Sequence, residues 1–230
     1  MTSVSNYLPA RLRSSDEQRG QSPAGVTLKF AKRQTVFHSG DPASRFYEVL
    51  TGTLIVFKML SDGRRQIVEI VPAGWLCGFA KDGFYDGSCE ALTDATVMAY
   101  AREDMETSAP LRSRLLHQTE EQFCAVHDQT LSLGRKSSEE RLSTFLMRFM
   151  PARGKRDCAG PQTPKDDATL HIPLSRSEIG DYLGLTIETV SRTVTVLSKK
   201  GLIEVGPNHG DIYIKDVCNL CAAARTGRNE

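Results

Sequence analysis

Short apolar runs, separated by turn residues, fill the chain from Thr27 to about Tyr100. Many short segments at this spacing are typical of an antiparallel β-sandwich or barrel. The runs that we expect to be strands are Gln34–His38, Phe46–Leu50, Thr53–Lys58, Arg65–Val71 and Thr96–Tyr100. The pattern therefore predicts a β-domain over residues 26–108. Residues 1–25 lack a periodic apolar pattern and are expected to form a flexible N-terminal arm.

After Pro110 the apolar residues recur at alternating steps of three and four. They occupy the a and d positions of a short heptad pattern, which are Leu116, Thr119, Phe123, Val126, Thr130 and Leu133. This period predicts a helix over residues 109–135, with Gly134 as its breaker. The stripe either packs back on the β-domain or pairs with a second copy of the chain, and the heptad spacing favours a homodimer seam.

Residues 136–230 are expected to form a second domain. Ser137 or Ser138 caps its first helix, with Glu140 in the first turn, and residues 151–168 have the composition of a surface loop. A strand is predicted over Leu170–Leu174, followed by the most informative stretch of the chain.

That stretch, Ser175–Val205, has the pattern of a helix-turn-helix. Ser175 caps a first helix and Thr186 caps a second, with Gly184 as the turn residue between them. The small Gly180 permits the close approach that two steeply crossing helices need. The predicted buried positions are Ile179, Gly180, Leu183, Val190, Val194 and Leu197. The segments "GLIEV" and "DIYIK" flank a Gly-rich turn and predict the β-hairpin wing of a winged helix.

In such a domain the second helix enters the major groove with its N-terminal residues at the base edges. The outward positions are Ile187, Glu188, Ser191 and Arg192. Arg192 suits a bidentate contact to guanine, and Glu188 can accept a hydrogen bond from cytosine. The alternative is that Glu188 and Arg192 form an ordinary surface pair at i,i+4. Candidate phosphate contacts are Ser175, Arg176, Thr186, Thr189, Lys199 and Lys200.

Composition adds bounds to this picture. The chain has 230 residues, with 29 Lys+Arg against 28 Asp+Glu, and a formal net charge of +1. A balanced charge speaks against a strongly basic nucleic-acid tract, but it bears on non-specific affinity and not on specific readout. Six scattered cysteines are too sparse for a disulfide scaffold, which favours the reducing cytoplasm. We find no apolar run long enough to span a membrane and no signal peptide.

The motifs "GDPASRFYEVLTG" (residues 40–52) and "RSEIGDYLGLTIETVSR" (residues 176–192) together resemble the CRP/FNR superfamily of bacterial transcription regulators. The resemblance implies an α+β chain with an N-terminal β jelly roll of the cyclic-nucleotide-binding type. A long dimerisation helix and a C-terminal winged helix-turn-helix complete the implied fold. Glu188, Ser191 and Arg192 are similar to the FNR and FixK branches, which read palindromes of the type TTGAT-N4-ATCAA. FixK-type regulators act on low-oxygen respiration and nitrogen-fixation genes.

The effector sites of related proteins are not matched here. Cyclic-nucleotide binders place an arginine where this chain has Gly87, and no arginine lies between Arg65 and Arg102. The first cysteine is Cys77, so the N-terminal trio of the iron–sulfur members is missing. Cys218 and Cys221 have metal spacing but no second ligand pair, and His38 stands alone for a cupin-like enzyme. We therefore expect no cofactor, no metal and no enzymatic activity.

The sequence thus predicts a homodimeric DNA-binding regulator, more an activator than a repressor, that works without an effector. Resemblance suggests that the loop near residues 153–167 contacts RNA polymerase. Cys77, Cys89 and Cys124 are expected to pack as small apolar residues, and Cys158 is the candidate oxidisable thiol. Two alternatives stay open. In the first, a small molecule bound in the β-domain controls DNA binding by the same fold. In the second, oxidation of Cys158 or of the Cys218/Cys221 pair controls it.

Overall fold

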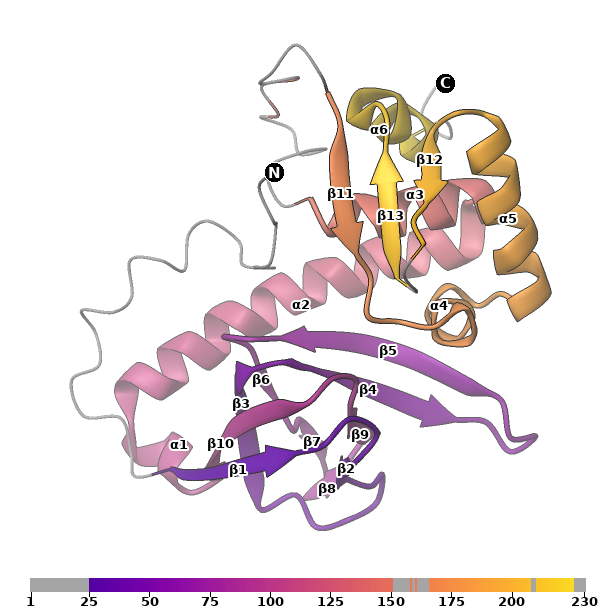
Figure 1. Cartoon of the computed structure of the whole chain (residues 1–230). Coiled ribbons are helices and arrows are strands. Elements are labelled where there is room, and N and C mark those ends of the chain that lie inside the picture. The colour runs from indigo at the N-terminus through magenta and orange to yellow at the C-terminus, as the bar shows by residue number, and fades with distance from the viewer. Residues whose placement is uncertain (1–24, 151–157, 159, 161–165, 208–209, 226–230) are drawn as a thin grey trace. The chain divides into compact units, whose positions relative to one another are not determined.

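The computed structural model describes residues 25–150, 158, 160, 166–207 and 210–225 (Figure 1). The expected arm therefore lies outside the described residues, apart from Gly25. Contacts divide the chain into two compact units, and the division falls between Val126 and His127, inside the long helix. None of the described helices is long and apolar enough to cross a membrane.

The first unit holds two four-stranded antiparallel sheets, ordered β1-β10-β3-β6 and β2-β9-β4-β5. The strands of the first sheet are β1 (Val26–Phe30), β10 (Ala95–Ala101), β3 (Arg45–Thr51) and β6 (Leu76–Cys77). Those of the second are β2 (Thr35–Phe37), β9 (Ser88–Ala91), β4 (Thr53–Met59) and β5 (Arg65–Pro72). A hairpin of β7 (Ala80–Lys81) and β8 (Phe84–Tyr85) adds to them. The predicted β-domain is thus confirmed, but β1 and the four short strands β6 to β9 were not among the strands named from the sequence.

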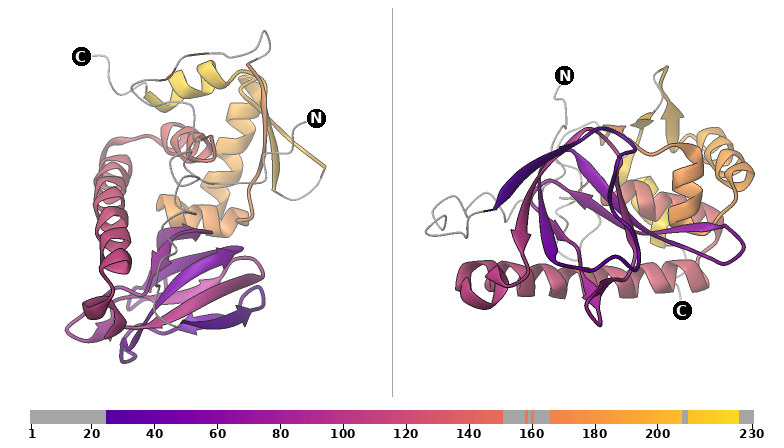
Figure 2. Two further views of the ribbon diagram at one scale, coloured as in Figure 1. Left: turned by 90° about the vertical axis from the view of Figure 1, so that its left-hand side faces the viewer. Right: turned by 90° about the horizontal axis from the view of Figure 1, so that it is seen from below.

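Both sheets curve round one shared core (Figure 2). Alternate residues point inward, so that Leu54 and Val97 are fully buried from opposite sheets. The ring of Phe37 stacks on Tyr85 with centroids 4.0 Å apart and on Tyr47 at 5.6 Å. These aromatic side chains form part of the core between the sheets.

The long helix α2 (Ala109–Arg135) follows the short α1 (Asp104–Thr107). Its first turns pack on the β-domain through Leu111, which lies in a cluster with Phe46 and Tyr100. The buried Gln118 accepts a hydrogen bond from the Leu76 amide at 2.9 Å and donates one to the Gly74 carbonyl at 2.9 Å. One face of α2 is therefore held by the β-domain, and the heptad stripe is not that face.

Helix α2 has the predicted bounds of 109–135, and Gly134, the predicted breaker, is its next-to-last residue. Cys77 and Cys89 are buried, as expected, but Cys124 is exposed on α2. The expectation for Cys124 was wrong because Cys124 is not on the face of α2 that the β-domain covers, which carries Leu111 and Gln118.

The second unit begins in α2 and continues with α3 (Ser138–Arg148) and the strand β11 (Ala168–His171). The helices α4 (Arg176–Leu183) and α5 (Ile187–Lys199) follow, and then β12 (Ile203–Val205), β13 (Asp211–Ile214) and α6 (Val217–Arg225). The three strands form one antiparallel sheet, ordered β11-β13-β12 (Figure 1). Ser137 and Glu140 form the expected capping box at the start of α3.

Candidate nucleic-acid interface

The first helix of the candidate interface, α4, starts at a complete capping box. The Ser175 hydroxyl accepts from the Glu178 amide at 3.3 Å, and the Glu178 carboxylate accepts from the Ser175 amide at 2.7 Å. Two backbone donors that a helix leaves unpaired are thereby satisfied. Glu178 is buried, so this cap also fixes α4 within the domain.

The turn between α4 and α5 depends on two glycines. Gly184 ends α4 with φ of 63°, a left-handed conformation that glycine adopts without strain. A Cβ on Gly180 would lie 2.6 Å from the Leu185 carbonyl oxygen. The close approach predicted from the sequence is therefore present, and any larger residue at Gly180 would push the two helices apart.

Helix α5 separates a buried face from an exposed face. Thr186 caps it, with its hydroxyl accepting from the Thr189 amide at 3.3 Å. The buried residues of α5 are Val190, Thr193, Val194 and Leu197. The four predicted base-reading residues, Ile187, Glu188, Ser191 and Arg192, are all exposed. The local sequence thus presents these four side chains together on the first two turns of the helix.

Arg192 is oriented by a neighbour that sequence reasoning assigned to another role. Its Nη2 donates to the Thr189 hydroxyl at 3.3 Å, and that hydroxyl lies 3.1 Å from the Thr186 hydroxyl. The pKa of the Glu188 carboxyl is lowered by its own backbone amide, by the Thr186 hydroxyl and by the charge of Arg192. The exposed surface of α5 therefore carries a carboxylate, which accepts hydrogen bonds, close to a guanidinium, which donates them.

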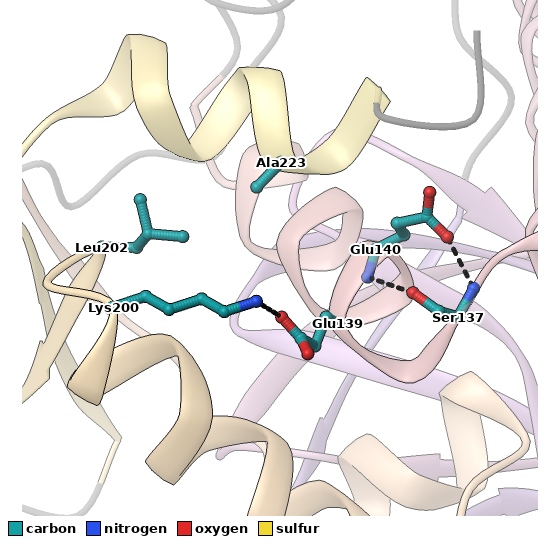
Figure 3. A pocket seen from close by; sticks show the side chains of 6 residues that line it. All are labelled: Ser137, Glu139, Glu140, Lys200, Leu202 and Ala223. Atoms are coloured by element: carbon teal, nitrogen blue, oxygen red, sulfur yellow. Dashed lines mark hydrogen bonds and ion pairs between the residues drawn. The ribbon is translucent and has the colours of Figure 1, made fainter. Parts of the chain in front are cut away.

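The candidate phosphate contacts lie in different environments. Ser175 and Lys199 are exposed, whereas burial lowers the pKa of the half-buried Arg176 guanidinium. Lys200 is ion-paired with Glu139 (Figure 3). That pair lies in a pocket lined by Ser137, Glu139, Glu140, Lys200, Leu202 and Ala223. The ammonium group of the exposed Lys199 is thus accessible to a phosphate, whereas the charge of Lys200 is partly neutralised by Glu139.

The wing has a support that the sequence pattern did not reveal. Strand β13 pairs with β12 on one side and with β11 on the other. His171 lies opposite Asp211 in this register, with Nδ1 2.8 Å from the Asp211 carboxylate. His171 and Asp211 are 40 residues apart, so no local sequence pattern predicts that they pair.

The six seam residues lie along α2 as the heptad requires. Leu116, Phe123 and Val126 have exposed fractions of 63%, 62% and 50%. Thr119 and Thr130 are also partly or fully exposed, and Leu133 is half-buried. Large apolar side chains in a row on one exposed helix face are typical of a protein–protein contact.

The β-domain has Gly87 at the position where related cyclic-nucleotide binders have an arginine. A Cβ at Gly87, where the related binders have arginine, would lie 3.1 Å from the Phe57 carbonyl oxygen. Arg65 is ion-paired with Glu90 at 3.0 Å, so it does not supply the missing guanidinium. Arg102 donates to the carbonyls of Ala43 and Gly78 at 2.6 and 2.7 Å, which is a structural role. An anionic phosphate would therefore lack its charge-assisted anchor among these residues.

The thiols differ in accessibility. A hydrogen bond with Cys89, together with burial, raises the pKa of the Cys77 thiol well above its usual value, which makes it unreactive. Cys158 and Cys221 are half-buried, and Cys218 is exposed. Within the described residues, no group of three or more histidine, cysteine or acidic side chains is placed to hold a metal ion.

Comparisons with known proteins agree with this architecture. The Cyclic nucleotide-binding domain profile matches residues 27–108, and the Crp-like helix-turn-helix domain profile matches residues 140–223. The chain is 34% identical over 208 residues to the nitrogen fixation regulation protein FixK of Bradyrhizobium diazoefficiens, covering 87% of this chain and 82% of that protein. It is 36% identical over 191 residues to FixK of Rhizobium meliloti, covering 81% and 83%.

Among solved structures, FixK2 from Bradyrhizobium japonicum superposes with a TM-score of 0.72 at 29% identity, over 86% of this chain and 96% of that one. The jelly roll, the long helix, the winged helix-turn-helix and these matches lead to one assignment. The chain belongs to the CRP/FNR family of DNA-binding transcription regulators.

Proposed function

We propose that this protein is a homodimeric, FixK-like transcription activator that reads a TTGAT-N4-ATCAA-type palindrome without an effector. The observation that carries the proposal is the exposed set Glu188, Ser191 and Arg192 on the first two turns of α5. Their spacing puts a carboxylate, a small hydroxyl and a guanidinium within reach of neighbouring base pairs in the major groove.

Each of these side chains has a distinct role in the proposal. Arg192 donates two hydrogen bonds to guanine O6 and N7, and Glu188 accepts one from cytosine N4. Ser191 is short enough to let the helix approach a thymine methyl group. Ile187, which is exposed at the first position of α5, adds apolar contact at the same edge.

The proposed dimer follows from the exposed heptad stripe of α2. Burying Leu116, Phe123 and Val126 against a second copy removes a large apolar area from water. A two-fold axis along this seam gives two recognition helices, and two such helices match a palindrome in successive major grooves.

Effector independence is supported by the interior of the β-domain. Large side chains, including the stacked Phe37, Tyr47 and Tyr85, are buried between its sheets. The position of Gly87 is too close to the neighbouring strand to take an arginine without movement. A cyclic nucleotide would need both room and a cationic anchor at this place.

The regulatory theme is taken from the relatives. Besides the two FixK proteins, the chain is 29% identical to the transcriptional activatory protein AadR of Rhodopseudomonas palustris. We propose that this chain likewise activates genes of nitrogen fixation or low-oxygen metabolism, in the cytoplasm and by contact with RNA polymerase. The loop near residues 153–167, a candidate for that contact, lies largely outside the described residues.

The test is binding of the purified protein, without additives, to a TTGAT-N4-ATCAA duplex by fluorescence anisotropy. Specific complexes of this kind are at least about 1,000-fold tighter than non-specific ones at physiological salt. We expect that ratio against a duplex of equal composition with scrambled half-sites. Equal affinity for the two duplexes would disprove specific readout. A requirement for an added cyclic nucleotide, or loss of binding after peroxide treatment that Cys158→Ser prevents, would favour the gated alternatives.

A further inference from the structure

The ends of two helices meet beside α3 in the second compact unit. Helix α2 ends at Arg135 and α4 ends at Leu183. The last four carbonyls of any α-helix lack intrahelical partners and carry a partial negative charge. Two such ends need donors from elsewhere in the domain.

One side chain of α3 supplies a donor to each of these two helix ends. Arg141 donates from Nη2 to the Leu133 carbonyl at 2.7 Å and from Nε to the Lys136 carbonyl at 2.9 Å. Its Nη1 donates to the Leu183 carbonyl at 3.0 Å. A second donor, Gln129 of α2, gives its Nε2 hydrogen to the Tyr182 carbonyl at 2.8 Å. The guanidinium therefore joins the end of α2, the α2–α3 connection and the end of α4.

We call these hydrogen bonds of Arg141 and Gln129 the joint. The joint connects the proposed dimer seam to the helix that is proposed to read bases. Gln129 and Leu133 lie on the same last turns of α2 as the seam residue Thr130, and Leu133 is itself a seam residue. On the other side, α4 leads through the tight Gly180–Leu185 contact directly into α5. All of these groups belong to one compact unit.

We propose that Arg141, assisted by Gln129, is a positioning residue that sets the spacing between the two half-sites that the dimer accepts. The inference rests on the proposed function, because it assumes a palindrome read by two recognition helices. In such a dimer the distance of each α5 from the two-fold axis is fixed by the link between the seam and α4. A one-base-pair change in the spacer moves a half-site by about 3.4 Å along the duplex and rotates it, so that a stiff link rejects the altered spacer.

Arginine suits this role for a geometric reason. Its planar fork holds several acceptors at fixed angles at once, whereas a lysine ammonium is a point charge on a flexible stem. Arg141→Lys keeps the positive charge but loses the planar fork. It therefore weakens the hydrogen bonds to the three carbonyls and leaves no acidic partner without its counter-charge. Gln129→Met removes the second donor and keeps the approximate length of the side chain.

The experiment measures affinity of the full chain for palindromes whose spacer is four base pairs, or one base pair shorter or longer. We expect the wild type to favour the four-base-pair spacer by at least about tenfold. Loss of one charge-assisted hydrogen bond is worth roughly tenfold in an equilibrium. Arg141→Lys should therefore reduce the preference to about threefold or less, with Gln129→Met in between, while discrimination against scrambled half-sites is retained.

The matched control is Arg148→Lys on the same helix. Arg148 donates to the Tyr182 hydroxyl and lies over its ring with its Cζ 5.5 Å from the centroid, so it contacts the side chain of an α4 residue. We expect this variant to keep the spacer preference, even if its melting temperature falls.

The outcomes separate the two proposals. A wild type that does not discriminate any palindrome from the scrambled duplex disproves the proposed function. A wild type that recognises the half-sites but shows no spacer preference, or an Arg141→Lys variant with the wild-type preference, overturns the positioning role. If Arg141→Lys does not fold, Gln129→Met decides, because an unchanged preference in a folded Gln129→Met variant overturns the role of the joint. An equal loss of spacer preference in Arg148→Lys also overturns the role of the joint, since general loosening of the domain would then explain the result.

Discussion

Helices α2 and α5 each present an exposed face, and the chemistry of the two faces is opposite. On α2 the exposed face carries Leu116, Phe123 and Val126, which are at least half exposed. On α5 it carries Glu188, Ser191 and Arg192. An apolar face gains free energy by contact with another apolar face, whereas a polar face finds hydrogen-bond partners in water as well as in a ligand. The first face is therefore suited to association with another apolar surface, and the second is suited to discrimination between hydrogen-bonding ligands.

The largest expected effect comes from placing a charge in the apolar face. Val126→Asp puts a carboxylate where two copies of α2 would meet, and an unpaired buried charge costs at least about 3 kcal/mol. We expect a monomer by analytical ultracentrifugation at concentrations where the wild type is dimeric. Operator affinity should fall by more than about 100-fold. Cys124→Asp, on the outer side of the same turn, is the matched control and should leave the dimer intact. A dimeric Val126→Asp variant would contradict the seam.

The next effect tests the polar face. Arg192→Ala removes the proposed bidentate contact to guanine, which is worth about 1–3 kcal/mol of discrimination. Binding to duplexes with each base substituted in turn should show a loss of preference at one base pair of each half-site and retained preference at the others. Unchanged affinity for the intact palindrome would show that Arg192 does not read a base.

A smaller effect distinguishes the two lysines at the end of α5. Lys199 is exposed, whereas Lys200 is ion-paired with Glu139. Removing one lysine that binds a phosphate lowers the slope of log affinity against log salt by about one. We expect that change for Lys199→Ala and a smaller one for Lys200→Ala, measured on a non-specific duplex. Glu139→Gln should then raise the slope, because it releases the Lys200 charge, and equal effects of the two lysine variants would contradict this difference.

The smallest effect concerns pH. The pKa of Glu188 is lowered, mainly by its own backbone amide and the Thr186 hydroxyl, so its carboxylate persists below the usual glutamate range. The stability that this ionised group contributes is present above its unfolded pKa and is lost as pH falls through the lower folded pKa. Discrimination at the cytosine should likewise stay constant down to mildly acidic pH and fall only below that range. Glu188→Gln should abolish this part of the pH dependence, and an identical acid profile in the variant would assign it elsewhere.

Much of the candidate site was accessible from the sequence because its signals are local. Ser175 with Glu178, Gly184 and Thr186 with Thr189 are caps and turns that act within a few residues, and the structure contains each of them. The steps of three and four along α2 also predicted its exposed stripe, since helical periodicity is a property of consecutive residues.

Sequence reasoning missed features whose local signal is too short or ambiguous, or whose partner is far away in the chain. The four short strands β6 to β9 have two to four residues each, too few for a period-two pattern to stand out. The exposure of Cys124 followed from which face of α2 the β-domain covers. The link from Thr189 to Arg192 was missed for another reason, because a threonine in this position looks the same whether it contacts a phosphate or a neighbouring guanidinium.

The sequence by itself determined the order of the β-domain, the long helix and the helix-turn-helix, together with the helix caps, the turn glycines and the residues that face outward on α5. Backbone preferences and helical periodicity act over short distances, which is why these features could be predicted. Only the tertiary structure decided that Lys200 is paired with Glu139, that Arg65 is engaged by Glu90 and that Arg141 holds the ends of α2 and α4. The paired residues lie 61 positions apart for Lys200, 25 for Arg65, and 42 between Arg141 and Leu183. A charged side chain has the same local sequence signature whether it is solvated or bonded, and its partner is chosen by the packing of elements that the local pattern does not contain.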